Sequence, residues 1–160
     1  MSGREVFQTT NQEPWVEAVL SGRVTAKTRT SKPNIRPGDV VLLHASKSMW
    51  PGWRNIKWAS GAGVDPKRLH LGCVVGVATV KAVAPSREML SAREARAWDL
   101  DNGRNCAAEW AVRFEDIVRL ENPVPARGFQ APYCRAKRET VESVAAANPC
   151  LRERLLGEGK

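Results

Sequence analysis

The chain has 160 residues, of which 42% are apolar and 26% charged, and these fractions are typical of a single globular domain. No apolar run approaches the roughly 18 residues of a membrane span, and the polar start lacks the apolar core of a secretory signal, so we expect no membrane contact. Lys and Arg outnumber Asp and Glu by 25 to 17, and the resulting net charge of +8 favours polyanionic partners.

Cysteine usage gives the expected compartment. The four cysteines form no CxxC pair (Cys73, Cys106, Cys134 and Cys150). This spacing matches neither a zinc site nor a dense disulfide framework, so we expect a reduced, cytoplasmic protein without a metal ion. The sequence also lacks GxxxxGK[ST] and GxGxxG, so we expect no nucleotide cofactor. We assume a monomer.

The first predicted element is a short helix over residues 12–21. Pro14 suits its first turn, and Gly22 fits the position just past its end. Residues 24–29 then alternate as a strand. That alternation places three cations on one side (Arg23, Lys27 and Arg29).

The rest of the chain predicts a bent sheet with helices at its ends. The expected elements are a buried strand over 39–45, a loop over 46–68, a strand over 70–82, a helical stretch within 85–98, strands over 108–113 and 116–120, and a helix over 139–147. Gly72 and Gly76 inside the long strand indicate a bend, as barrels require. Strands and helices do not alternate as in a doubly wound sheet. We expect one domain over residues 10–148, a flexible N-terminus over 1–9 and a polar tail over 149–160.

The positive charge is concentrated in one segment. Residues 23–68 hold ten bases and two acids, whereas residues 1–22 carry a net −2 and residues 69–160 a net +2. An evenly mixed, solvated surface does not give this distribution. Three tryptophans also alternate with cations in the predicted loop (Trp50, Trp53 and Trp58 among Lys47, Arg54 and Lys57). A cationic groove with aromatic platforms is the usual way to bind single-stranded nucleic acid.

Two polar residues near the buried strand over 39–45 are candidates for chemistry. A lone histidine such as His44 in an apolar strand is more often a hydrogen-bonded core residue than a catalyst, but a nearby carboxylate would make it an acid or base. Ser46 follows it and flanks Lys47, and spacing alone does not define a nucleophile with its base.

Several blocks of the sequence together resemble a known domain. They are Pro14-Trp15, Gly22 with Arg29, RPGDVVLLHASK (36–47), LGCVVGVATV (71–80) and EWAVRFEDIVRLENPVPARGFQ (109–130). These blocks resemble the ASCH domain, a β-barrel domain of the PUA-like superfamily, over most of the chain. The resemblance implies an α+β fold: a small PUA-like/ASCH β-barrel with flanking helices.

The resemblance also implies work on RNA. Members of the family are thought to bind RNA, some are amidohydrolases of N4-acetylcytidine, and one bacterial branch is described as a single-strand ribonuclease. The family signature Gly-x-Lys-x-x-Glu-x-Arg is matched here by Gly22 and Arg29, but Val24 and Lys27 stand at its Lys and Glu positions. The residues of the amidohydrolase type fall at Val24, Lys27 and near Trp98, and none of the three matches.

We therefore predict an RNA-binding module that recognises single-stranded or unstacked RNA. Its cleft is expected between the first helix, the first strand and the loop over 46–68. We assign the contacts to five cations and two stacking tryptophans (Arg23, Lys27, Arg29, Lys47, Arg54, Trp50 and Trp53).

Three alternatives stay open from the sequence. The first is an RNA-directed hydrolase, either a ribonuclease or an N4-acetylcytidine-type amidohydrolase, with Lys27, His44 and Ser46 as candidate catalytic residues. The second is DNA as the ligand, because attraction to phosphate does not depend on the sugar. The third is a protein-docking patch formed by the tryptophan loop.

Overall fold

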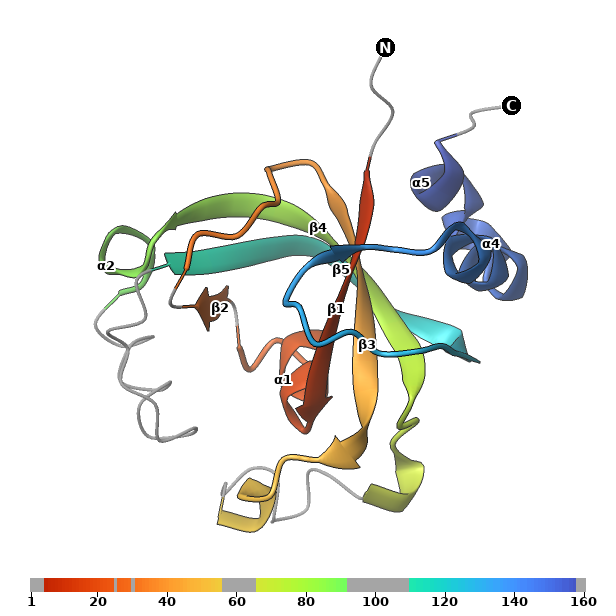
Figure 1. Ribbon diagram of the computed structural model, residues 1–160, viewed down its shortest axis with the longest axis horizontal. Helices are drawn as coiled ribbons and strands as arrows, with labels where there is room; N and C mark the ends of the chain where they lie inside the picture. Colours follow the sequence, from red (N-terminus) through yellow and green to blue (C-terminus); the bar gives the residue numbers. More distant parts are fainter. Residues whose placement is uncertain (1–4, 25, 30, 56–65, 92–109, 158–160) are drawn as a thin grey trace.

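The structure is a computed structural model that describes residues 5–24, 26–29, 31–55, 66–91 and 110–157. Within these residues the strands form one six-stranded sheet in the order β2-β5-β4-β3-β1-β6. The strands are β1 (Val6–Glu13), β2 (Ala26–Arg29), β3 (Val40–Met49), β4 (Cys73–Pro85), β5 (Trp110–Pro125) and β6 (Cys134–Arg135). The pair β1–β3 is parallel and the other pairs are antiparallel. The sheet curls into a half-barrel with helices beside it (Figure 1), which confirms the predicted α+β class.

Alternate residues of β3 supply two separate cores. Val41 and Leu43 lie in the concave core with α1 (Trp15–Leu20), whereas Val40 and Leu42 lie in the core on the other face. That second core is covered by the C-terminal helices (Figure 1). These helices are α4 (Arg138–Ala147) and α5 (Arg152–Leu156). The other short helices in the described residues are α2 (Ser86–Met89), η1 (Trp53–Asn55), η3 (Pro66–Arg68) and η4 (Pro149–Leu151). A strand buried on both faces explains the continuous apolar run in its sequence.

The curl of the sheet comes from irregular pairing between β4 and β5. The register shifts three times along this pair, once beside Gly76. A Cβ at Gly76 would lie 2.5 Å from Leu20 Cδ2 and 3.1 Å from the Val118 carbonyl oxygen, so this bend requires glycine. Asp116 has a φ of 49°, and the two strands predicted over 108–113 and 116–120 are one strand that bends there. The prediction of two strands was wrong because, in the sequence alone, a bend inside one strand cannot be distinguished from a turn between two strands.

Both predicted ends of the domain are corrected. Residues 6–9, expected in a flexible N-terminus, form the first half of β1, and the predicted helix starts later, at Trp15. β1 is held between β3 and β6 by pairing that the local sequence does not show. Residues 149–156, expected as a polar tail, form η4 and α5, whose Leu151 and Leu155 are buried in the second core.

The predicted loop over 46–68 is also shorter than expected. Residues 46–49 extend β3, and Met49 pairs with Glu13 at the end of β1. The predicted helix over 139–147 is confirmed as α4, and the helical stretch within 85–98 is described only as α2. Trp58 and Trp98 lie outside the described residues. Nowhere in the described part of the chain is a helix long and apolar enough to cross a membrane.

We predict that Asn148 fixes α4 to the sheet. Its buried side chain donates to the Asn122 carbonyl oxygen at 3.0 Å and accepts from the Asn122 N–H at 3.1 Å. Asn148→Ala leaves both β5 groups without these partners and should lower the free energy of unfolding by about 1–3 kcal/mol in urea denaturation. The exposed control Asn34→Ala should change it little, and equal effects of the two substitutions would contradict this role.

Candidate functional site

Side chains, rather than backbone hydrogen bonds, connect β2 to β1 at one edge of the half-barrel. β2 pairs with β5, β1 pairs with β3 and β6, and no ladder joins β2 to β1 in the residues that the structure describes. Across this gap Lys27 Nζ donates to Asn11 Oδ1 at 2.9 Å, and Asn11 Nδ2 donates to Thr9 Oγ1 at 3.3 Å. We call this place the barrel mouth and define it by five residues: Thr9, Asn11, Lys27, Arg29 and Tyr133.

Arg29 is the second cation of the barrel mouth. Its guanidinium is half-buried, and Nη2 donates weakly to Ser31 Oγ at 3.4 Å. Its Nε is buried and lacks a hydrogen-bond partner among the described residues. Burial lowers the pKa of Arg29, and Tyr133 opposes that shift. A buried N–H without an acceptor is costly, so Arg29 is suited to a ligand that brings an oxygen atom.

A second group of predicted residues lies at the turn after β3, over residues 50–54, which we call the tryptophan turn. Trp50 is half-buried and meets Trp15 edge-on, with ring centroids 5.6 Å apart. The turn closes tightly on it, because a Cβ at Gly52 would lie 2.5 Å from the Trp50 ring. Trp53 is also half-buried and carries the Arg54 guanidinium 4.9 Å from its ring centroid. Trp50 is therefore partly a packing residue, while Trp53 pairs an aromatic face with an exposed cation.

Helix α1 separates the barrel mouth from the tryptophan turn. The Val24 N–H, which leads into β2, donates to the Ala18 carbonyl oxygen at 3.1 Å, and Trp15 of the same helix contacts Trp50. Arg23 is exposed between α1 and β2. Helix α1 thus contacts both the segment that leads into β2 and Trp50 of the tryptophan turn.

Sequence reasoning missed a second cation–aromatic pair beside the barrel mouth. Lys32 Nζ lies 5.3 Å from the Trp110 ring centroid, and Trp110 pairs with Arg29 across β2 and β5. The two residues are far apart in the chain, and the sequence carries no signal for the register that brings them together. Their place next to Arg29 extends the cationic surface of the barrel mouth.

Glu13 is a buried carboxyl group at the start of α1. Its side chain is 2% exposed, and Oε1 accepts the Glu17 N–H at 2.8 Å. Burial raises the pKa of Glu13 to about 7, the Glu17 carboxylate adds to this, and backbone N–H groups and Arg119 oppose it. Glu17 itself forms a two-pronged ion pair with Arg119, at 2.6 and 2.7 Å. The Trp50 N–H donates to the Glu13 carbonyl oxygen at 2.7 Å, so Glu13 connects β1, α1 and the tryptophan turn.

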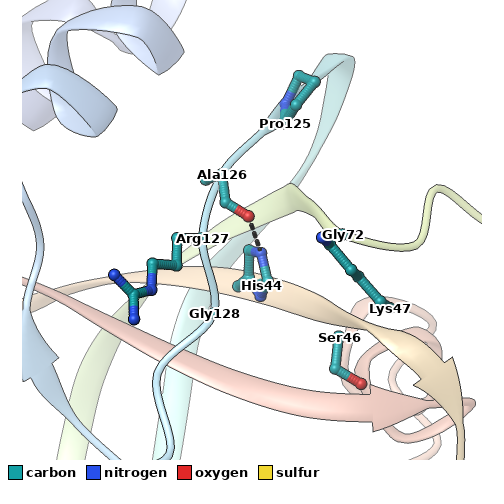
Figure 2. Close-up of a pocket in the computed structure, with 8 residues that line it drawn as sticks. All are labelled: His44, Ser46, Lys47, Gly72, Pro125, Ala126, Arg127 and Gly128. Carbon is teal, nitrogen blue, oxygen red and sulfur yellow. Dashed lines mark hydrogen bonds between the residues drawn. The ribbon is translucent and has the colours of Figure 1, made fainter.

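A pocket of about 550 Å³ lies beside the end of β3 (Figure 2). Its wall is the segment 125–128, which crosses the sheet after β5. We call it the His44 pocket and define it by its lining: His44, Ser46, Lys47, Gly72, Pro125, Ala126, Arg127 and Gly128. Figure 2 shows Ser46 and Lys47 on one side of the imidazole and Arg127 on the other.

The His44 pocket and the barrel mouth lie on opposite faces of the sheet. A Cβ at Gly128 would lie 3.0 Å from Thr10 Cγ2 and 3.2 Å from His44 Cε1, so Thr10 and His44 share one face. Asn11, the partner of Lys27, is the next residue in β1 and therefore points to the other face.

The predicted site residues therefore divide among separate places. Lys27 and Arg29 meet at the barrel mouth, Trp50, Trp53 and Arg54 meet at the tryptophan turn, and Lys47 lines the His44 pocket instead. Of the candidate catalytic residues, His44 and Ser46 share that pocket without Lys27. Ser46 Oγ donates to the Ser48 carbonyl oxygen at 3.0 Å. Across the described ranges, no three His, Cys, Asp or Glu side chains come together as metal ligands would.

Solved structures share this fold. The ASCH protein of Zymomonas mobilis matches with a TM-score of 0.54 at 13% identity, over 89% of this chain and 95% of that one. A variant of the same protein with a serine replaced by alanine matches with a TM-score of 0.55 at 14% identity, over 91% and 98%. No family model and no curated protein matches the sequence. The chain thus has the ASCH-domain fold, as the sequence resemblance predicted.

We predict that Glu13 makes stability depend on pH. Its pKa is higher in the folded protein, at about 7, than its ordinary 4.5, so folding binds a proton between these values. The stabilisation is complete below about pH 4.5 and is lost as the pH rises through 7. The free energy of unfolding of the wild type should therefore fall by up to about 3 kcal/mol from pH 5 to pH 8.

Urea denaturation at several pH values measures this effect. Glu13→Gln keeps the size of the side chain without a titrating group, so its stability should be nearly flat over this range. Glu139→Gln removes an exposed carboxylate from α4 and should leave the wild-type pH profile unchanged. A Glu13→Gln profile as steep as that of the wild type would contradict the assignment.

Proposed function

We propose that this chain is an ASCH-domain protein that binds single-stranded or unstacked RNA at the barrel mouth. The observation that carries the proposal is the edge between β2 and β1, where no ladder joins the described residues and Lys27 reaches across to Asn11, with Arg29 two residues further along β2. The ASCH-domain fold supports it, because the family resemblance of the sequence implies RNA as the partner.

The chemistry of the two cations suits RNA. Lys27 holds a neutral amide oxygen, and a phosphate oxygen would form a stronger, charge-assisted hydrogen bond in its place. The Arg29 Nε is a buried donor without a partner in the described part of the chain, and the planar fork of arginine fits phosphate oxygens or base carbonyls. Lys27 thus offers a point charge, and Arg29 a directional set of donors, to an RNA strand bound at the barrel mouth.

The tryptophan turn supplies the aromatic part of the proposed interface. Unstacked bases are recognised on aromatic side chains and on arginine planes. Trp53 with Arg54 over its ring provides both at one position, whereas Trp50 is held against Trp15. We therefore assign stacking to Trp53 and a supporting role to Trp50.

The geometry favours binding over hydrolysis. Lys27 lies on the opposite face of the sheet from His44 and Ser46, so the three candidate catalytic residues do not form one reaction centre. Labelled single-stranded RNA and N4-acetylcytidine should therefore stay intact after incubation with the purified protein. Turnover that Lys27→Ala abolishes would instead establish the hydrolase alternative.

We predict that Lys27→Ala with Arg29→Ala weakens binding to single-stranded RNA and flattens its salt dependence. Each phosphate contact on a single strand contributes about 0.7 to the slope of log K against log salt. Loss of two contacts should make the slope less steep by about 1.4, and anisotropy titrations at four salt concentrations measure it. Parallel titrations with duplex DNA report whether RNA is preferred.

The matched control removes the same charge from the other side of the molecule. Lys137 and Arg152 are exposed residues next to α4 and in α5. Lys137→Ala with Arg152→Ala should lower affinity slightly and leave the salt slope within about 0.3 of wild type. Equal slopes for the wild type and the Lys27–Arg29 variant, with both folded, would refute the site.

We also predict that Trp53→Leu weakens RNA binding by about 1–3 kcal/mol, the usual contribution of one stacked base. Trp53→Phe keeps an aromatic face and should retain most of the affinity. The same anisotropy titration measures the RNA affinity of both variants. If Trp53→Phe loses as much as Trp53→Leu, the ring does not act by stacking. Retained RNA affinity with loss of a protein partner would identify a docking patch.

A further inference from the structure

The His44 pocket has the charge of an anion site. Among the residues that the structure describes, its lining contains two exposed cations, Lys47 and Arg127, and includes neither aspartate nor glutamate. The two residues lie on either side of the buried imidazole of His44, and the Arg127 side chain extends away from the ring (Figure 2). A pocket of about 550 Å³ is in the range that holds a small ligand of nucleotide size.

The wall of the pocket is fixed in place before any ligand binds. Gln8 Nε2 donates to the Arg127 carbonyl oxygen at 2.9 Å, and Thr10 Oγ1 accepts the Phe129 N–H at 3.0 Å. The Ala126 N–H donates to the Gly72 carbonyl oxygen at 3.1 Å. Segment 125–128 is therefore held to β1 and to the start of β4, and a ligand would bind without ordering this wall first.

His44 uses only one of its two ring nitrogens for a hydrogen bond within the described residues. His44 is 1% exposed, and its Nε2 lies 2.8 Å from the Ala126 carbonyl oxygen, which requires a proton on Nε2. Its Nδ1 is buried and lacks a hydrogen-bond partner within the described ranges. A Cβ at Gly128 would lie 3.5 Å from Nδ1, and because residue 128 is glycine, its side chain does not cover this side of the ring. A buried polar atom that the protein leaves without a partner is suited to a hydrogen bond with a ligand atom.

We propose that the His44 pocket binds a phosphate monoester, with Lys47 and Arg127 neutralising the phosphate and protonated His44 donating to it through Nδ1. This inference is independent of RNA binding at the barrel mouth, because it rests on other residues on the other face of the sheet.

Binding of the phosphate should be linked to protonation of His44. The charged side chains of the pocket lining are Lys47 and Arg127, while Gln8, Thr10 and Ser46 do not titrate in this range. Burial lowers the pKa of His44, and the carbonyl groups of Ala126 and Gly72 oppose this shift. A bound anion raises the pKa of His44 and therefore favours the protonated ring.

Proton NMR with three probes tests the site. Sulfate keeps its charge between pH 5.5 and 8, so any pH dependence of its binding comes from the protein. We expect sulfate and adenosine 5′-monophosphate, but not adenosine, to shift the His44 Cε1–H resonance, and sulfate to bind about tenfold more tightly at pH 5.5 than at pH 8. A 5′-phosphorylated oligonucleotide compared with its 5′-hydroxyl form shows whether an RNA end is also accepted.

Variants separate this site from the rest of the molecule. His44→Gln keeps a donor for Ala126 and should abolish the pH dependence, whereas His70→Gln, at the chain's other histidine, should preserve it. Arg127→Ala removes an exposed side chain but not the wall, and should weaken binding of adenosine 5′-monophosphate at least fivefold. The Lys27–Arg29 variant should bind this nucleotide as the wild type does.

Three results would overturn the proposal. They are an unmoved His44 resonance at saturating sulfate, equal affinity for adenosine and its monophosphate, and full binding by folded Arg127→Ala. Loss of nucleotide binding in the Lys27–Arg29 variant would also contradict it, because that result would place the ligand at the barrel mouth.

Discussion

The structure depends on an edge that backbone hydrogen bonds do not close. The bends of β4 and β5 bring β2 round toward β1, but β2 is only four residues long and pairs with β5. The Lys27 side chain spans the remaining gap to Asn11, and Arg29 lies near the buried Tyr133. Two cations are therefore held between β2 and β1, beside the concave core. The same feature completes the fold and provides the proposed ligand site.

Strand β1 contributes side chains to both faces of the sheet. Successive residues of β1 point in opposite directions, so Thr10 belongs to the His44 pocket and Asn11 to the barrel mouth. This geometry explains why Lys27 and His44, both candidates for catalysis from the sequence, do not meet. It also places the two proposed basic sites on opposite faces of one small domain.

The sequence predicted the parts of this account that depend on local pattern. Alternation in residues 24–29 placed Lys27 and Arg29 on one side, and the apolar run of β3 indicated a strand buried on both faces. It could not predict β1, since Gln8 and Glu13 are polar residues whose burial is explained by distant partners such as the Arg127 carbonyl oxygen. The pairing of Trp110 with Arg29, and the crossing of segment 125–128 over His44, likewise depend on long-range register.

Backbone NMR of the complete chain tests the central claim most directly. Single-stranded RNA is titrated into ¹⁵N-labelled protein, and the change of each amide signal is followed to saturation. RNA that enters the barrel mouth should move the signals of Ala26–Arg29, Asn11 and Tyr133 most, and leave those of α4 unchanged. Saturation with changes confined to α4 and α5, or with no change along β2, would contradict the account.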